Sequence, residues 1–443
     1  MPITQSMPAR RLVPHVLLAL CSALAIAQPA RAGVTAAWIG GDIPLHSPSQ
    51  QGGGSKAIAD ADGNVYAYWI GQGADKGMRL LVARRAAGSS SWGAPVEVGS
   101  AGALFNFPSA VLNPDGDLTV AWTHNDGDSS DVETATIDTA DGSWNGQTDR
   151  VETPHGNAQD ATLIADGAGT QTLIWADNGD ITVSRRPAGG GWSAPQAISG
   201  SLTGQGAIAV AGPGGDVVAF WGRNGTEAFG TSVYDGAAGT WSEPASTPFT
   251  GDVVFPRLIA DGRGGYAVTW FDPDNYPASA EVKVLRMAAG ATTWGATEIL
   301  NQPGVFAATP DIAALPGGDL YAIWTEMDFG TGVMSIKART WSRASGDWGA
   351  EEVVREPAVG GYAGARISSR PNGDLVGAVV HYTGPNPLLA VWARDHETGA
   401  WSQPEDLPDT ALAVNTVPVL ATDEDGNALV SWDEQPASDR SAH

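Results

Sequence analysis

The sequence contains a single cysteine, Cys21, which lies in a short apolar segment near the N-terminus. Without a second thiol the chain cannot close an intramolecular disulfide or build a cysteine-ligated metal site. If that segment is removed, no cysteine nucleophile remains either. The folded part must therefore be stable through its own hydrophobic core, which a chain of 443 residues is long enough to build.

Long hydrophobic runs are also missing, since none reaches the roughly 20 residues that a membrane-spanning helix needs. The apolar run at 16–27 follows two arginines and precedes an A-R-A sequence that ends at Ala32. Basic residues, a short apolar segment and an A-x-A site in this order are typical of a secretory signal peptide. We predict a signal peptide over 1–32, a secreted or periplasmic product, and a single domain over 33–443. Attachment of lipid at Cys21 is an alternative.

Basic residues are scarce, with 24 Lys and Arg against 49 Asp and Glu and a formal net charge of −25. Such a surface repels nucleic acid and anionic membranes, so we expect neither as a partner. The acidic residues are scattered singly through the sequence and form no acidic tail, which argues against a disordered chain.

Tryptophan, by contrast, is abundant, and 15 of the 17 tryptophans fall into two series whose members lie 46 to 55 residues apart. One series sits in phrases such as GTWSEP (239–244) and comprises Trp38, Trp92, Trp144, Trp192, Trp241, Trp294, Trp348 and Trp401. The other ends short apolar runs and comprises Trp69, Trp122, Trp175, Trp221, Trp270 and Trp324, then Val379 in place of Trp, then Trp432. A period of this length indicates a repeated supersecondary unit.

Each repeat predicts four strands. A short apolar strand and a DG-type turn lead to a second strand that ends in Trp, as in DLTVAW (117–122). A variable polar loop, a third strand and a Gly-x-Trp turn then lead to a fourth strand. Alternating apolar residues and Gly or Asp punctuation indicate strands, and no segment has helical periodicity. Four strands in about 50 residues are typical of a β-propeller blade, so we predict an all-β propeller.

The repeats indicate eight blades, with seven as the alternative. The last pair of strands falls at 417–432, while Trp38 precedes every pair. We therefore expect the N-terminal strand around Trp38 to complete the last blade and to close the ring, which removes free sheet edges. We expect the tryptophans to pack between neighbouring sheets; stacking of some of them on sugars is the alternative.

The repeats resemble two groups of propellers. TADGSW (139–144) resembles the Asp-box of the sialidase-like superfamily, and the repeated W-S-x-P resembles propeller lectins of the fucose-binding type. The lectin resemblance implies sugar pockets between blades that combine Arg and Trp. Arginines precede the Gly-Trp turns here at Arg85, Arg185, Arg286, Arg339 and Arg394. Solvated positions on the sheet are the alternative reading of these arginines.

The variable loops after the second strands should share one rim of the propeller, where binding chemistry usually lies. The candidate ligand-binding residues on this rim are His124, Asp126, Asp272, Asp274, Glu326, His381 and Tyr382. Carboxylates and imidazoles of this kind can bind a divalent cation such as calcium or act as acid and base, and a solvated acidic rim is the alternative. We expect no cofactor and identify no catalytic constellation.

Three functions are compatible with these features. The first is a carbohydrate-binding, lectin-like propeller without catalysis. The second is a glycan-cleaving enzyme, a glycoside hydrolase or polysaccharide lyase, whose site lies on the variable rim. The third is an interaction scaffold whose partner is an envelope or extracellular ligand. The regular repetition and the lack of a recognisable catalytic motif favour binding over catalysis.

Overall fold

The computed structural model describes residues 52–436 apart from 61, 73–77, 90, 100–107, 126, 152, 154, 224–227, 250–252, 275–277, 358–359, 384–386, 407–411, 415–416, 423–425 and 433. Over these residues the chain is built from β-strands, and the one helical turn is the 3-10 turn η1 (Pro213–Gly215). No helix in this part of the chain is long and apolar enough to cross a membrane. The predicted all-β fold is confirmed.

The strands follow one another in repeated units. The first three units are β1 (Gly52–Ala59), β2 (Val65–Gln72), β3 (Met78–Arg85), β4 (Val96–Val98); β5 (Ser109–Leu112), β6 (Leu118–Asn125), β7 (Ser130–Ile137), β8 (Asp149–Val151); and β9 (Ala158–Ala165), β10 (Gln171–Asp177), β11 (Asp180–Arg186), β12 (Gln196–Ala197). The fourth and fifth are β13 (Gly204–Ala211), β14 (Val217–Arg223), β15 (Ala228–Asp235), β16 (Thr240–Trp241), β17 (Ala245–Pro248); and β18 (Val254–Ala260), β19 (Tyr266–Asp272), β20 (Glu281–Met287), β21 (Glu298–Ile299).

The remaining units complete the described chain. They are β22 (Phe306–Ala314), β23 (Leu320–Asp328), β24 (Val333–Trp341), β25 (Glu352–Arg355); β26 (Gly361–Ser369), β27 (Leu375–Tyr382), β28 (Leu388–Arg394), β29 (Glu405–Asp406); and β30 (Leu412–Val414), β31 (Val419–Thr422), β32 (Ala428–Ser431), β33 (Glu434–Pro436). Within each of the first seven units, antiparallel strands pair in chain order, and β16 and β17 both pair with β15.

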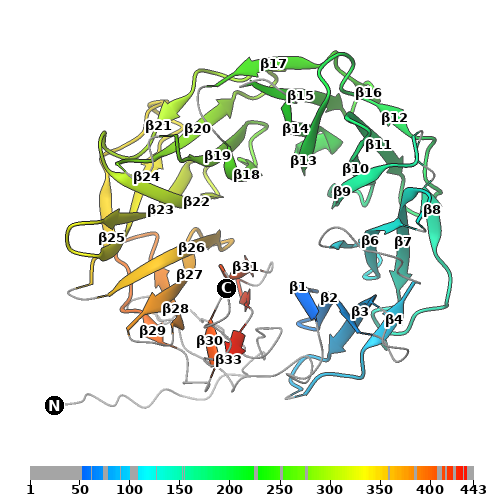
Figure 1. Ribbon diagram of the computed structural model, residues 1–443, viewed down its shortest axis with the longest axis horizontal. Coiled ribbons are helices and arrows are strands. Elements are labelled where there is room, and N and C mark those ends of the chain that lie inside the picture. The colour runs from blue at the N-terminus through cyan, green and yellow to red at the C-terminus, as the bar shows by residue number, and fades with distance from the viewer. Residues whose placement is uncertain are drawn as a thin grey trace.

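The units are arranged as a ring of sheets, with the first strand of each unit innermost and the short fourth strand at the periphery (Figure 1). Short edge strands of this kind limit pairing with other chains. In four units a proline stands directly before the fourth strand: Pro95, Pro195, Pro244 and Pro404. Proline is tolerated there because an outer strand needs no donor on its solvent side.

The last unit is a hairpin in which β30 pairs with β33 and β31 pairs with β32. Glu434–Pro436 therefore extends the second strand of this unit and does not form a third one. The hairpin packs between the first and seventh units, because Trp432 shares one hydrophobic cluster with Trp69 and Val391. The ring is thus closed in space by this hairpin. The predicted strand around Trp38 lies outside the described residues, so eight complete blades remain a prediction.

The tryptophans that end the second strands form the centre of the packing between sheets. Each is at most 3% exposed: Trp69, Trp122, Trp175, Trp221, Trp270, Trp324 and Trp432. The tryptophans of the Gly-x-Trp turns pack against the same clusters from the outer side, and Trp294 is the most buried of those described. The predicted packing role is confirmed by this burial for the described tryptophans of both series; Trp38 lies outside the described residues.

The innermost strands carry a bulge opposite the second-strand tryptophan. The register shifts there in the first unit and in the third to the seventh. The first bulged residue has a positive φ in five of these units: Asp160, Gly206, Phe255, Thr309 and Gly364. In these six innermost strands the bulge bends the strand and fixes which side chain follows it at the same level of the ring.

Candidate functional site

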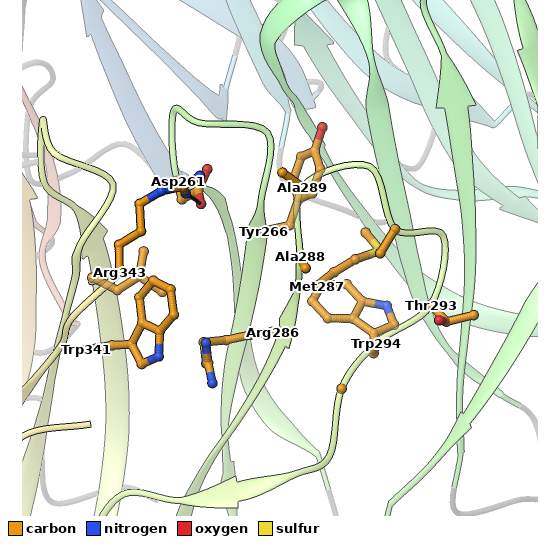
Figure 2. A pocket seen from close by; sticks show the side chains of 13 residues that line it. Asp261, Tyr266, Arg286, Met287, Ala288, Ala289, Thr293, Trp294, Trp341 and Arg343 are labelled. Carbon is orange, nitrogen blue, oxygen red and sulfur yellow. Dashed lines mark hydrogen bonds and ion pairs between the residues drawn. The ribbon is translucent and has the colours of Figure 1, made fainter. Parts of the chain in front are cut away.

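A pocket of about 600 Å³ lies between the fifth and sixth units, and Figure 2 shows its side chains. Its walls come from the turn after β18, the start of β19, the end of β20 with the turn to β21, and the end of β24. These turns belong to the face that carries the DG-type and Gly-x-Trp turns. The pocket therefore lies on the face opposite the variable rim and away from the candidate ligand-binding residues of that rim.

Arg286 stands at the centre of this pocket, between the indoles of Trp341 and Trp294 (Figure 2). Its guanidinium carbon lies 4.3 Å from the centroid of the Trp341 ring, which is a cation–π distance. Arg286 Nη2 donates to Glu298 Oε1 at 3.0 Å, so the carboxylate fixes the guanidinium above the ring. Neither indole N–H has a hydrogen-bond partner among the described residues.

The opposite wall is built around the carboxylate of Asp261, which is 7% exposed. Asp261 Oδ1 accepts the backbone N–H groups of Arg263 and Gly265 at 2.7 and 2.8 Å, and Arg343 Nη1 donates to Asp261 Oδ2 at 3.0 Å. Burial, together with the charges of Asp216 and Asp261, raises the pKa of Tyr266 to about 12. The pocket therefore presents indole faces, guanidinium donors and a neutral phenol, and contains no evident nucleophile.

The arrangement of Arg286 and Trp341 is repeated elsewhere in the ring. Arg185 of the third unit lies over Tyr234 of the fourth, with 3.6 Å from the guanidinium carbon to the ring centroid. Arg394 of the seventh unit lies over Tyr321 of the preceding unit at 5.0 Å, so its contact runs in the opposite direction and does not repeat this arrangement. Arg85 is 6% exposed, and Arg339 Nε is buried. The alternative of solvated arginines is therefore wrong for Arg185, Arg286 and Arg394, which pack against rings, and for Arg85, whose Nε donates to the carbonyl of Ser89.

The predicted rim residues form separate pairs inside their own units. His124 Nδ1 lies 3.7 Å from Glu133 Oε2. Asp272 pairs with Lys283 at a site where both side chains are at most 6% exposed. Although burial favours the neutral amine, the carboxylates of Asp272 and Glu281 raise the pKa of Lys283.

Other rim candidates are also engaged locally. Glu326 Oε2 lies 3.8 Å from Lys337 Nζ, and burial raises the pKa of the Glu326 carboxyl group. The backbone N–H of Asp274 donates to Asp272 Oδ1 at 3.0 Å. Asp126 lies outside the described residues. Where the chain is described, no group of three His, Cys, Asp or Glu side chains is placed to hold a metal ion.

His381 has the most organised surroundings of the rim candidates. Its Nδ1 lies 2.6 Å from Asp406 Oδ1, and its ring stacks on Tyr362 with 4.3 Å between centroids. Burial, followed by the charge of Asp406, raises the pKa of Tyr362. Tyr382, the next residue along the strand, is 37% exposed. The structure thus joins His381 to Tyr362 and Asp406, which the sequence analysis did not single out, while Tyr382 faces solvent.

Sequence reasoning missed the pocket of Arg286 because its residues stand in turns that repeat in every unit. One available signal was Trp341, which falls outside both tryptophan series and follows Arg286 by one repeat. The periodicity alone cannot reveal that Trp341 sits beside Arg286, since contact between neighbouring units depends on the twist and packing of the sheets.

No protein-family model and no curated protein match the sequence. Among solved structures, the chain is similar to a polysaccharide lyase described as a PL25 ulvan lyase, with 11% identity, a TM-score of 0.48, and coverage of 87% of this chain and 92% of the lyase. It is similar to AofleA from Arthrobotrys oligospora, with 12% identity, a TM-score of 0.36, and coverage of 68% and 85%. It is also similar to the β-propeller domain of the trilobed protease from Pyrococcus furiosus, with 9% identity, a TM-score of 0.43, and coverage of 81% and 98%. The chain is a β-propeller.

Proposed function

We propose that this protein is an exported, eight-bladed propeller that binds carbohydrate without cleaving it. The observation that carries the proposal is the pocket between the fifth and sixth units, in which Arg286 is held over Trp341 and faces Trp294. Sugars combine an apolar C–H face with a rim of hydroxyls. Indoles match the first and guanidinium N–H groups match the second.

The charges of the pocket fit a neutral or weakly anionic sugar. Asp261 is engaged by Arg343 and two backbone N–H groups, and Glu298 is engaged by Arg286. Arg286 donates to Glu298 from Nε and Nη2 and to the carbonyl of Gly346 from Nη2. The two N–H groups of Nη1 are left for ligand oxygens, since a guanidinium carries five N–H groups. A site of this kind binds and orients a ligand, and offers no acid–base pair for bond cleavage.

The test combines a glycan array with calorimetry on the glycans that bind. Arg286→Gln should weaken binding roughly tenfold or more, because a hydrogen bond to a charged group contributes about 1.5–3 kcal/mol. Arg394→Gln is the matched control, since Arg394 also lies over an aromatic ring but does not line the pocket. No binding across a broad array, or equal affinity of the Arg286 variant and the parent protein, would contradict the proposal.

A second variant tests how many such sites the ring carries. Arg185 stands in the same relation to Tyr234 as Arg286 to Trp341. If several pockets bind the same glycan weakly, Arg185→Gln should lower the number of ligands bound per chain and the avidity for multivalent glycans. If the pocket of Arg286 acts alone, Arg185→Gln should leave both unchanged.

The group around His381 favours one alternative function, a glycan-cleaving enzyme of the hydrolase or lyase class. A histidine whose Nδ1 is held by a carboxylate, as by Asp406 at 2.6 Å, is oriented as a general base. The measurement is product formation from polysaccharides by reducing-end and unsaturated-product assays. His381→Gln should abolish turnover while leaving glycan binding at the pocket of Arg286 intact; absence of turnover in the parent protein would remove this alternative.

A further inference from the structure

One position of the innermost strands repeats at the same level around the ring. In each unit this residue pairs with the residue that stands immediately before the second-strand tryptophan, or before Val379 in the seventh unit. Where the innermost strand has a bulge, the residue follows the bulge directly. In chain order these residues are Lys56, Ser109, Thr162, Ile208, Arg257, Asp311, Arg366 and Val419. We call this set the channel ring. It brings together residues that lie far apart in the sequence.

Five residues of the channel ring line a cavity of about 550 Å³ on the axis of the propeller, and Arg366 lies next to its lining residue Ile367. Lys56, Arg257 and Asp311 line it, together with Thr162 and Ser368. Innermost strands from the first, third, fourth, fifth, sixth and seventh units contribute to this lining. The cavity is therefore a property of the closed ring and not of any one sheet.

The carboxylate of Asp311 is shared between neighbouring units. Its Oδ1 lies 3.2 Å from Arg257 Nε, and its Oδ2 accepts the backbone N–H of Ile367 at 2.9 Å. Asp311 is 6% exposed, and its bond to the Ile367 N–H holds it against the innermost strand of the next unit. Its single negative charge balances one of the surrounding cations. The other cations of the channel ring have no carboxylate of their own.

Arg366 and Lys56 are the cations in excess. Arg366 is 8% exposed, and its described hydrogen bond is to the carbonyl of its own neighbour Ala365. Lys56 has no hydrogen-bond or ion-pair partner among the described residues. Burial and then the charge of Arg257 lower the pKa of Lys56, and the same two causes lower the pKa of Arg366 to about 10. These cations repel one another across the cavity.

Within the described innermost strands, Asp160 is the one remaining charged residue. It stands on the bulge with a φ of 54°, is exposed, and does not line the cavity. Lys56 and Arg257 in the wall of the cavity and Arg366 beside the lining residue Ile367 thus surround the single carboxylate of Asp311, in a chain whose formal net charge is −25. A local surplus of positive charge in so acidic a protein needs a counter-charge, because buried charges are stable only when they are paired.

We propose that the channel ring binds a small dianionic oxyanion, with phosphate or sulfate as the chemical class. Beyond the pair of Arg257 and Asp311, Lys56 in the wall and Arg366 next to it supply two positive charges, which match a dianion. The ammonium of Lys56 and the guanidinium of Arg257 donate to its oxygens, and the hydroxyls of Thr162 and Ser368 line the same cavity. The site is separate from the glycan pocket and does not depend on the proposed function.

The experiment is a calorimetric titration of the purified protein with sodium sulfate, sodium phosphate, glucose 6-phosphate and, as a monoanion, acetate. One dianion should bind per chain, and acetate should bind at least about tenfold more weakly, as expected for the loss of one charge-assisted contact. Equal binding of inorganic phosphate and glucose 6-phosphate would mean that the site takes a phosphoryl group on a larger ligand. Binding of the inorganic ions alone would mean that it takes the free ion.

Lys56→Met should weaken sulfate binding roughly tenfold or more, whereas Lys56→Arg, which keeps the charge, should retain most of it. Arg263→Met is the matched control, because it removes one exposed positive charge from a turn outside the cavity. Melting temperatures without anion show that each variant is folded. The proposal is overturned if no dianion binds, or if the Lys56 and Arg263 variants bind sulfate equally. Arg286→Gln should leave sulfate binding unchanged, which separates this test from that of the glycan pocket.

Discussion

Gly377 and Trp392 face each other across the strands β27 and β28, and a Cβ atom on Gly377 would lie 2.7 Å from Cε2 of the indole. Trp392 is fully buried in the cluster that also contains Val379. The seventh unit lacks a tryptophan at the end of its second strand, and the third strand supplies an indole instead. The glycine is what makes room for it.

Gly377→Ala should destabilise the protein by about 1–3 kcal/mol, because the added methyl group overpacks against a buried ring that has little space to move. Gly167→Ala is the control, since nothing lies within 4 Å of a Cβ at that turn position. Chemical denaturation of the two variants measures the difference. Equal free energies of unfolding would show that Trp392 can shift without cost.

The buried pair of Lys283 and Asp272 predicts a strongly asymmetric response to mutation. Lys283→Met should cost about 3–5 kcal/mol, because it leaves the Asp272 carboxylate buried without its cation. Combining it with Asp272→Asn should recover part of this loss, since the remaining polar group is neutral. Urea denaturation of the parent protein and of the three variants completes the cycle. A double variant as unstable as the sum of the two single variants would contradict a direct pairing.

His396 should titrate above its ordinary value, because Asp374 Oδ1 lies 2.8 Å from its Nδ1 and raises the pKa of the imidazole. With the pKa raised in the folded state, the pair contributes stability below pH 6.5, and this contribution is lost as the pH rises through the folded-state pKa. NMR titration of the His396 ring measures the pKa directly. In Asp374→Asn the raised pKa of His396 should return toward 6.5.

The ring closure predicted from the sequence can be tested at Trp38. If the segment around Trp38 completes the last unit, Trp38→Ala should lower the melting temperature by several degrees, as loss of a packed indole costs about 3–5 kcal/mol. The comparison is Trp241→Ala, because Trp241 belongs to the same series and is half-buried. Its change in melting temperature shows the effect to expect from a packed tryptophan of this series. If Trp241→Ala lowers the melting temperature and Trp38→Ala leaves it unchanged, the predicted ring closure is contradicted.

Much of the fold could be predicted because the strands and turns of each repeat follow from signals within a few neighbouring residues. The second strands are apolar runs that lead to a tryptophan in most units, and they are buried almost continuously, as Trp175 and Trp221 show at 0% exposure. Glycines such as Gly169 and Gly373, with φ of 79° and 92°, mark the turns between the first two strands. Because each signal involves only a few residues, it can be recognised in a single sequence.

The candidate sites could be predicted only in part. His381 stood out because it adjoins the one second strand without a terminal tryptophan, yet its partners Tyr362 and Asp406 come from other strands of the unit. Arg286 was noticed as one of several similar arginines, and nothing local distinguishes it from Arg185. Its place in a pocket follows from contact with the sixth unit.

The sequence by itself determined the strands, the turns and the tryptophans that fill the spaces between sheets, because these follow from periodicity and side-chain type within each repeat. Only the tertiary structure decided which repeats touch. It placed Arg286 beside Trp341, and it set Lys56, Arg257 and Arg366 at one level of the channel. The physical reason is that a closed ring aligns equivalent positions of every innermost strand on one axis, so side chains separated by hundreds of residues meet there.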